Sequence, residues 1–479
     1  MCYNVFMAGG LIESFSGIRG IYGQELTGDL AYKYGMVYHH IFHKPGAILV
    51  VAGDSRKSTS VLKKYFIRSF QDCGAKKIFD LGVVPIQVAE LAIIKFKAQG
   101  GVYISASHNE PEFNGWKLLK QDGALFYPRQ IDRLIRAVHQ AGANNFKSAN
   151  NRQIATVIDK HQQAIQAYIR FISVSLGKQA MAKIKQANFK IIFDPNGGAA
   201  ISVIKLFCQA LNIQAKIVNS RLGQFGRKVE PNVESLGYLS AKLNDDYLFA
   251  AGFDCDADRV EFVLPAQSNF AKEMGVVLNG NYVLALACDA RLAGTKNQIV
   301  VTNDATSYLV RDVIKKYQAK IKEVEVGEMV IVKAMEKYQS VIGGEGSNGG
   351  IIVSPIKCRD GLMSIALILK MLAIHGQSLS EILAEYPKYY SSHNKVVCQS
   401  DKAIDARQRL IDYFKNKGYK IRTTGGITGG AKALLDINTY TWWRQSKTEP
   451  GVFRIYCESD DKNKVDELAR ETIQIFNKL

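Results

Sequence analysis

Three stretches of the chain share one pattern, an apolar, β-branched run that ends in a polar or glycine-containing turn. They are AILVVAGDSR at 47–56, FKIIFDPNGG at 189–198 and NQIVVTNDATS at 297–307. Each run is typical of a buried strand, and the segment SVLKKYFIRSF after the first run is typical of a helix. The pattern predicts three related α/β units. Because open α/β sheets bind ligands at the carboxyl ends of their strands, we expect the candidate chemistry in the turns.

The rest of the chain departs from this pattern. The segment DKHQQAIQAYIRFISVSL at 159–176 has helical spacing without a strand signal, which suits a connection between the first two units. From about residue 390, four strand-like runs (NKVVCQS, YKIRTT, TYTWWRQ and VFRIYCES) flank two helical patterns, so a smaller α+β fourth domain is predicted. A chain of 479 residues is too long for one core, and we place domains at 1–155, 156–265, 266–385 and 386–479.

Composition narrows the class of protein. The formal net charge is +18, but Lys and Arg are dispersed in pairs, which favours a solvated surface over a nucleic-acid groove. The eight cysteines form no C-x-x-C pair, and the N-terminus lacks the basic region of a signal peptide. No window approaches the roughly 18 apolar residues of a membrane span. We therefore expect a reduced cytoplasmic protein with neither a membrane nor a nucleic acid as its partner.

A candidate metal site lies in the segment FDCDADR, which carries Asp254, Asp256 and Asp258. In an extended strand or loop, side chains repeat with period two, so the three carboxylates face one way and suit Mg²⁺. An EF-hand loop needs Gly and Glu where this chain has Arg259 and Pro265. The alternative is an acidic solvated turn, but the apolar runs YLFAAGF and VEFVL on either side argue against exposure.

A candidate nucleophile lies in YISASHNEPEFNGWKLL at 103–119. Ser107 follows an apolar strand, where a turn presents its hydroxyl at the mouth of a sheet. His108 points away from Ser107 on an extended chain, so we expect it to orient the loop rather than deprotonate the serine. Lys117 lies beyond the Asn114-Gly115 turn and can act as an acid or base if desolvation lowers its pKa. Spacing alone fits a structural loop equally well.

A glycine-rich loop, GGEGSNGGII at 343–352, contains the G-x-G-x-x-G spacing of dinucleotide-binding proteins. The β-branched run that follows Gly349 disfavours the helix that such binding requires. Glu345 and Ser347 instead suit vicinal sugar hydroxyls, because a carboxylate accepts paired O–H bonds.

A candidate anion site lies in RQSKTEP, where Arg444, Ser446 and Thr448 alternate, with Arg454 further along the chain. Arginine binds phosphate in a bidentate fork, and the hydroxyls add donors, so a phosphate cradle is predicted. The alternative is an Arg–Glu surface pair.

Together and in this order, these motifs resemble the α-D-phosphohexomutase family of phosphoglucomutases, phosphomannomutases and phosphoglucosamine mutases. The resemblance spans nearly the whole chain. It also includes SFSGIRG with Arg19, GDSR at 53–56, DPNGG at 194–198 and RDG at 359–361. The chain departs from the family pattern at Glu110, at Cys255 and at the SNGG of the sugar loop, which leaves the choice of sugar open.

The resemblance implies three α/β domains with mixed sheets and a smaller α+β domain, in a heart shape around a central cleft. It implies that Ser107 is a phosphoserine in the first domain and that, in the second, the three aspartates hold one Mg²⁺ per active site with a phosphoserine oxygen. The implied catalytic residues near the transferred group are Ser107, His108, Arg19, Arg259 and Lys117, with Lys117 the acid/base. Glu345 and Ser347 of the third domain then hold sugar hydroxyls. The residues of the fourth domain that bind the non-reacting phosphate are Arg444, Ser446, Thr448 and Arg454.

The implied reaction moves phosphate between the 1- and 6-positions of a hexose phosphate through a hexose 1,6-bisphosphate, which also acts as activator. We expect mannose and glucose phosphates as substrates, with phosphoglucosamine mutase as the alternative, and a monomer or homodimer. Two distant alternatives are a nicotinamide-dependent oxidoreductase and a nucleic-acid-binding protein. For the second, the net charge of +18 would attract the nucleic-acid phosphates.

Overall fold

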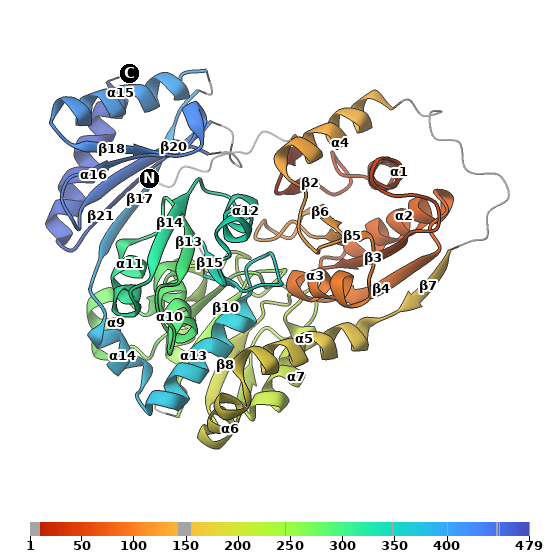
Figure 1. The fold of residues 1–479 in the computed structure, drawn as a ribbon, viewed down its shortest axis with the longest axis horizontal. Coiled ribbons are helices and arrows are strands. Elements are labelled where there is room, and N and C mark those ends of the chain that lie inside the picture. The colour runs from red at the N-terminus through yellow and green to blue at the C-terminus, as the bar shows by residue number, and fades with distance from the viewer. Residues whose placement is uncertain are drawn as a thin grey trace. The chain divides into compact units, whose positions relative to one another are not determined.

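The computed structural model of the protein describes residues 10–141, 155–244, 246–346, 349–399, 401–446, 449 and 451–478. The chain divides into two compact units, residues 1–277 with 353–376, and residues 278–352 with 377–479. The described residues form sheets of seven, five, four and five strands, with helices around them (Figure 1). The first two sheets belong to the first unit, apart from the last residue of β12, and the other two belong to the second unit.

The first sheet has the strand order β1-β2-β6-β5-β3-β4-β7. It is mixed, since β3 is parallel to β4 and β5 whereas β6 is antiparallel to β2 and β5. The strands are β1 Ile12–Ser14, β2 Gly17–Ile21, β3 Ile48–Gly53, β4 Lys77–Val83, β5 Gly100–Ile104, β6 Phe113–Lys120 and β7 Thr156–Asp159. The helices are α1 Gly28–Phe42, α2 Thr59–Asp72, α3 Ile86–Lys95 and α4 Pro128–Gln140. Helix α1 packs against α2 and α4 over a core that contains Tyr34, Phe66 and Trp116, while α3 contacts β3 and β5.

The second sheet has the order β12-β11-β10-β8-β9 and is also mixed, because β10 is parallel to β8 and antiparallel to β11. Its strands are β8 Lys190–Asp194, β9 Gln214–Ile217, β10 Phe249–Phe253, β11 Val260–Val263 and β12 Val277–Leu278. The helices near it in the chain are α5 His161–Leu176, α6 Lys178–Ala187, α7 Ile201–Leu211, α8 Val233–Leu236, η1 Gly237–Lys242 and α9 Asn269–Met274. The predicted helix at 159–176 and the predicted strand at 189–198 are therefore present as α5 and β8.

Helix α13 (Gly361–His375) belongs to the first unit, where it packs against α5 and α6 and is buried along most of its length. Among the described helices, none is by itself long and apolar enough to cross a membrane. Helices α13 and α14 (Leu379–Glu385) meet the length and composition criteria only when they are joined across a break.

The third sheet has the order β14-β13-β15-β16, with β13 Ile299–Asn303, β14 Lys320–Val324, β15 Ile342–Gly344 and β16 Ile351–Ile352. Strand β13 is parallel to β14 and β15, whereas β16 is antiparallel to β15. The helices of this part are α10 Gly280–Leu292, α11 Tyr308–Ile314, η2 Lys315–Tyr317 and α12 Glu328–Tyr338. Strand β13 is the third of the predicted α/β strands, and its carboxyl end leads into α11.

The fourth sheet is antiparallel and has the order β17-β21-β20-β19-β18. Its strands are β17 Tyr390–Val397, β18 Lys420–Thr423, β19 Ala431–Leu434, β20 Tyr440–Gln445 and β21 Val452–Ser459. The helices are α15 Ala403–Asn416 and α16 Lys462–Asn477, with the short η3 Gly426–Thr428. Helices α15 and α16 pack on each other and on the sheet, around Phe414, Trp443 and Phe453.

The predicted α/β class with mixed sheets and an α+β C-terminal part is confirmed. The boundaries at 1–155, 156–265, 266–385 and 386–479 stay predictions.

Candidate active site

The loop between β10 and β11 carries the three predicted metal ligands. One oxygen from each of Asp254, Asp256 and Asp258 lies within 4.8 Å of the others, and each residue is at most 1% exposed. Ala257, between the second and third aspartates, has a left-handed backbone with φ +59°. The carboxylates therefore converge through a turn, and not through the alternation of an extended strand.

Nearby cations balance this buried negative charge. Burial raises the pKa of Asp254 well above its usual range, and the charges of Asp258 and Asp256 add to the shift. Burial alone would also raise the pKa of Asp256, but the Lys117 ammonium lowers it below its usual value. Arg359 Nη2 donates to Asp258 Oδ2 at 3.0 Å. Each aspartate thus differs in its surroundings, although the three lie in one turn.

The donor set fits a hard divalent cation. Two buried carboxylate oxygens, Asp256 Oδ1 and Asp258 Oδ1, accept no hydrogen bond from the residues that the structure describes. Buried oxygens without donors are costly, and three converging carboxylates repel one another. A cation such as Mg²⁺, which prefers oxygen ligands, removes both penalties.

Ser107 lies against this cluster, in the loop that follows β5. Its Oγ donates to Asp254 Oδ2 at 3.3 Å, and its backbone N–H donates to Ser105 Oγ at 2.7 Å. Ser107 is 2% exposed and has a left-handed backbone with φ +53°. Such a conformation costs a non-glycine residue about 1–3 kcal/mol and is concentrated at functional sites. The structure thus brings the predicted nucleophile to the first predicted metal ligand.

Arg56, which the sequence interpretation did not assign a role, fixes the serine loop. Its Nη2 donates to the carbonyl oxygen of Ser107 at 3.0 Å and to that of Asn109. The guanidinium is buried and also pairs with Asp54. The GDSR motif at 53–56 marked this segment, but its pattern indicated only the end of a buried strand.

The predicted catalytic cations lie around the same cluster. Lys117, on β6, places its Nζ 2.8 Å from Asp256 Oδ2 and is 5% exposed. Arg19, on β2, donates to Asn109 Oδ1 at 3.0 Å, and burial lowers the pKa of its guanidinium to about 10. Arg259 donates its backbone N–H to Asp254 Oδ1 at 3.2 Å. Its side chain pairs with Glu230 at 2.8 Å, a partner that the sequence interpretation missed.

His108 follows the predicted nucleophile, and its surroundings disfavour the protonated imidazole. Burial lowers its pKa well below the usual range, and the charges of Arg259, Arg19, Arg359 and Lys117 lower it further. Its Nδ1 has no hydrogen-bond partner within the described part of the chain. The predicted catalytic residues and metal ligands of the first unit are thus gathered in one cluster, in which Arg19 and His108 are half-buried and the others are buried.

In the second unit, the predicted sugar loop begins after β15 with Glu345, which is 7% exposed. Its Oε1 accepts from Asn303 Nδ2 and from Gly327 N, both at 3.1 Å. Gly346 N donates to Thr306 Oγ1 at 3.2 Å. Ser347, the other predicted sugar ligand, lies outside the described residues. Strand β16 follows the loop, where a dinucleotide-binding motif would be followed by a helix.

The predicted phosphate cradle places two arginines opposite each other. Arg444 on β20 and Arg454 on β21 are direct partners in the antiparallel register. Like charges in this position are destabilising unless an anion lies between them or beside them. Arg444 donates to the carbonyl oxygen of Val326 at 3.4 Å and lies 3.7 Å from Glu325 Oε1. Burial lowers the pKa of Arg444, because a guanidinium that is shielded from water loses solvation of its charged form.

Glu449 lies between β20 and β21 in the chain and contacts residues of this sheet. This carboxylate accepts from Arg454 and from Lys395 Nζ, the latter at 2.7 Å. Its backbone N–H donates to Ser446 Oγ at 3.1 Å. Arg–Glu pairing was the alternative to a phosphate cradle. Arg454 pairs with Glu449, and Arg444 makes a longer ion pair, at 3.7 Å, with Glu325. Thr448 lies outside the described residues.

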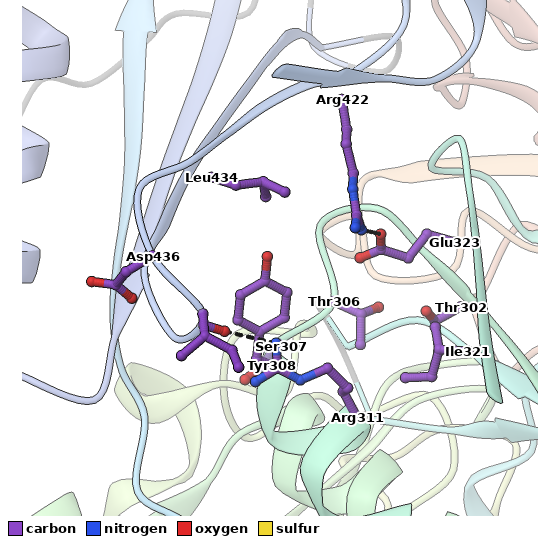
Figure 2. A pocket seen from close by; sticks show the side chains of 11 residues that line it. Thr302, Thr306, Ser307, Tyr308, Arg311, Ile321, Glu323, Arg422, Leu434 and Asp436 are labelled. Atoms are coloured by element: carbon purple, nitrogen blue, oxygen red, sulfur yellow. Dashed lines mark hydrogen bonds and ion pairs between the residues drawn. The ribbon is translucent and has the colours of Figure 1, made fainter. Parts of the chain in front are cut away.

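A cavity of about 330 Å³ lies in the second unit (Figure 2). Thr306, which binds Gly346, is one of its lining residues. Arg422 pairs there with Glu323 at 3.4 Å, and Arg311 donates to the carbonyl oxygen of Ile437 at 2.8 Å (Figure 2). Both guanidinium groups that line the cavity are therefore already partnered.

Two parts of the chain match models of a known protein family. Residues 12–145 match the description "Phosphoglucomutase/phosphomannomutase, alpha/beta/alpha domain I", and residues 279–390 match domain III of the same family. A phosphoglucomutase/phosphomannomutase of Thermococcus kodakarensis is 31% identical, over 97% of each chain. A probable phosphoglucosamine mutase of the same organism is 29% identical, again over 97% of each chain.

Among solved structures, a phosphoglucomutase/phosphomannomutase family protein from Burkholderia thailandensis shares the fold with a TM-score of 0.77. It is 19% identical, and the alignment covers 97% of each chain. The chain belongs to the phosphoglucomutase/phosphomannomutase family, within the α-D-phosphohexomutases.

Proposed function

We propose that the protein is a phosphohexomutase that moves a phosphoryl group between the 1- and 6-positions of a hexose phosphate through phospho-Ser107. One observation carries the proposal. The Ser107 hydroxyl lies 3.3 Å from Asp254 in a left-handed turn, beside two further buried aspartates and the Lys117 ammonium. A hydroxyl in this position suits phosphoryl transfer, which depends mainly on positioning and on neutralising charge.

Asp254, Asp256 and Asp258 would hold one Mg²⁺, together with an oxygen of phospho-Ser107. When bound, the ion neutralises charge on the phosphoryl oxygens. Arg56 holds the carbonyl oxygen of Ser107 and so keeps the nucleophile in its turn. We assign stabilisation of the transferred group to the remaining cations, Arg19 and Arg259.

Proton transfer is assigned to Lys117. In the first half-reaction, the phosphorus–Oγ bond of phospho-Ser107 breaks and a bond forms to a hydroxyl oxygen of the hexose phosphate. The ammonium of Lys117 gives a proton to the departing Ser107 oxygen, and the resulting amine takes the proton of the attacking hydroxyl. The second half-reaction reverses these steps from the other phosphate of the hexose bisphosphate. Asp256, at 2.8 Å, holds the ammonium for this exchange.

The second unit supplies the residues assigned to the rest of the substrate. We assign sugar hydroxyls to Glu345 and Ser347. The non-reacting phosphate is assigned to Arg444, Ser446, Thr448 and Arg454. The opposed arginines of β20 and β21 support an anion at this position, since a phosphate relieves their repulsion. Arg454 must share its guanidinium with Glu449 or release it when phosphate binds.

The relatives named above leave the sugar divided between glucose or mannose phosphate and glucosamine phosphate. We favour glucose and mannose phosphates, with phosphoglucosamine mutase as the alternative. The hexose 1,6-bisphosphate is proposed as both intermediate and activator. A cytoplasmic location, a monomer or homodimer, and the lack of nucleic-acid and membrane partners stay predictions.

The test compares kcat/KM on mannose 1-phosphate, glucose 1-phosphate and glucosamine 6-phosphate, each with a trace of the matching bisphosphate. A preference of about tenfold, or about 1.4 kcal/mol, assigns the sugar. A preference for glucosamine 6-phosphate selects the alternative. The lack of turnover on all three, by a folded protein in magnesium, would overturn the proposed function.

A further inference from the structure

Gln87 lies in the first turn of α3, and its fully buried amide reaches the metal loop. The side-chain Nε2 donates to the carbonyl oxygen of Ala257 at 3.1 Å and to Asp360 Oδ1 at 3.4 Å. Ala257 is the left-handed residue between the second and third predicted metal ligands. The amide thus holds the loop at the point where its chain turns.

The backbone of the same helical turn provides a second anchor. Ile86 N donates to the carbonyl oxygen of Asp256 at 3.2 Å. Two consecutive carbonyl groups of the loop, those of Asp256 and Ala257, are therefore held by the first turn of α3. Because each peptide is planar, fixing these two carbonyls orients the peptide after Asp256 and the peptide before Asp258, and so restricts the directions in which these two side chains leave the chain.

The start of α13 approaches the loop as well. Asp360 Oδ1, which accepts from Gln87, also accepts from Tyr168 OH at 2.6 Å, so its position is fixed from another helix. A Cβ at Gly361 would lie 3.3 Å from the carbonyl oxygen of Ala257, a spacing that glycine leaves open. Arg359, next in the chain to Asp360, binds Asp258 directly. Gln87 therefore joins two helix starts and the metal loop.

The chemistry of the side chain indicates why an amide is used. Burying an amide is costly unless its hydrogen bonds repay the desolvation. Gln87 Oε1 is buried and accepts no hydrogen bond from the described residues, so the contribution of this amide comes from its two Nε2 bonds. An apolar side chain of similar length fills the same space but leaves the Ala257 carbonyl without this donor.

From these contacts we propose that Gln87 is a positioning residue for the divalent cation, which acts by fixing the Asp256–Ala257–Asp258 turn. The inference rests on the proposed metal centre and adds a residue outside its ligand set. Substitution of groups that orient metal ligands commonly weakens metal affinity by about 10–100-fold.

The test measures Mn²⁺ binding by the electron paramagnetic resonance signal of the free ion, for the wild-type protein and for Gln87→Met. We expect the dissociation constant of the variant to rise at least about tenfold. We also expect its hexose phosphate turnover, weakened at low Mg²⁺, to return to within about twofold of wild type at saturating Mg²⁺, because mass action refills the site. Should Gln87→Met not fold, Gln87→Asn carries the same test, since its amide is one methylene too short.

The matched control is Ile93→Ala. Ile93 is buried on the same helix, and among the described residues it forms no hydrogen bond with the metal loop. The inference is overturned if Gln87→Met binds Mn²⁺ as tightly as wild type, or if Ile93→Ala weakens binding equally. A wild-type protein that binds Mn²⁺ but does not act on hexose phosphates refutes the proposed function alone. A wild-type protein that binds no Mn²⁺ overturns both the metal centre and the role of Gln87.

Discussion

Replacement of Lys117 by Met is expected to destabilise the metal-free protein more than the magnesium-bound protein. Lys117 Nζ lies 2.8 Å from Asp256 Oδ2, and the two side chains are 5% and 0% exposed. Methionine keeps most of the length and the apolar stem of lysine, so the substitution removes the charge with little change in packing.

The magnitude follows from the burial of this pair. Removing one partner of a buried ion pair typically costs about 3–5 kcal/mol, because the other charge is left without compensation. Of the groups that lower the pKa of Asp256 against the effect of burial, Lys117 has the largest effect, so the variant loses most of that stabilisation of the carboxylate. A bound divalent cation supplies the missing positive charge. We therefore expect the loss in magnesium to be less than about half of the loss without metal.

The assay is urea unfolding of both proteins, followed by circular dichroism, in EDTA and in Mg²⁺. The control is Lys63→Met, which breaks a pair of similar length, 2.7 Å, whose side chains are 21% and 23% exposed. This more exposed pair should contribute about 0–1 kcal/mol in either condition. The reasoning is refuted if Lys117→Met costs the same with and without Mg²⁺, or no more than Lys63→Met.

Three further predictions concern the second unit. Burial raises the pKa of Glu458 to about 7, because the buried side chain is more stable in its protonated form. The protonated form therefore contributes fully to the free energy of unfolding below about pH 4.5, and this contribution is lost as the pH rises to about 7. Near pH 8, Glu458→Gln should therefore be more stable than wild type by about 3 kcal/mol and unfold at a higher temperature. Near pH 4.5 it should show no such gain, and calorimetry at both pH values checks this. Arg444→Met should raise KM for hexose phosphate by about thirtyfold or more through loss of a buried phosphate contact, as steady-state kinetics would show. Gly346→Ala places a Cβ 1.9 Å from Asn281 Oδ1 and should impair substrate binding, whereas Gly237→Ala, with no atom within 4 Å, should bind normally in the same kinetic assay.

Much of the fold could be predicted because its signals are local. The runs at 47–56, 189–198 and 297–307 contain β3, β8 and β13, whose apolar, β-branched residues form buried strands. Strand β19 was not predicted, since Ala431–Leu434 is short and has no β-branched residue to mark it. The part of β17 from Asn394 on was predicted but its start was not, because Tyr390–His393 has no aliphatic β-branched residue to mark a strand.

The site was predictable where its residues occur in motifs and not where they meet through the fold. Asp254, Asp256 and Asp258 lie within five residues of one another, so their convergence could be foreseen, although the turn at Ala257 that produces it could not. Arg56 lies 51 residues from the serine it holds, and Gln87 lies 170 residues from the carbonyl oxygen of Ala257. Their segments carry only the signals of a strand end and a helix start, and such contacts become visible once the chain is folded.

The most direct test identifies the residue that takes up the labelled phosphoryl group when the protein is incubated with labelled glucose 1,6-bisphosphate. Peptide mapping of the wild type is predicted to find the label on Ser107, and Ser107→Ala should take up none and lose turnover. Ser105→Ala, which removes a neighbouring buried hydroxyl, should still be labelled at Ser107. Label on a different residue, or a folded Ser107→Ala protein that interconverts hexose phosphates at the wild-type rate, would contradict the account.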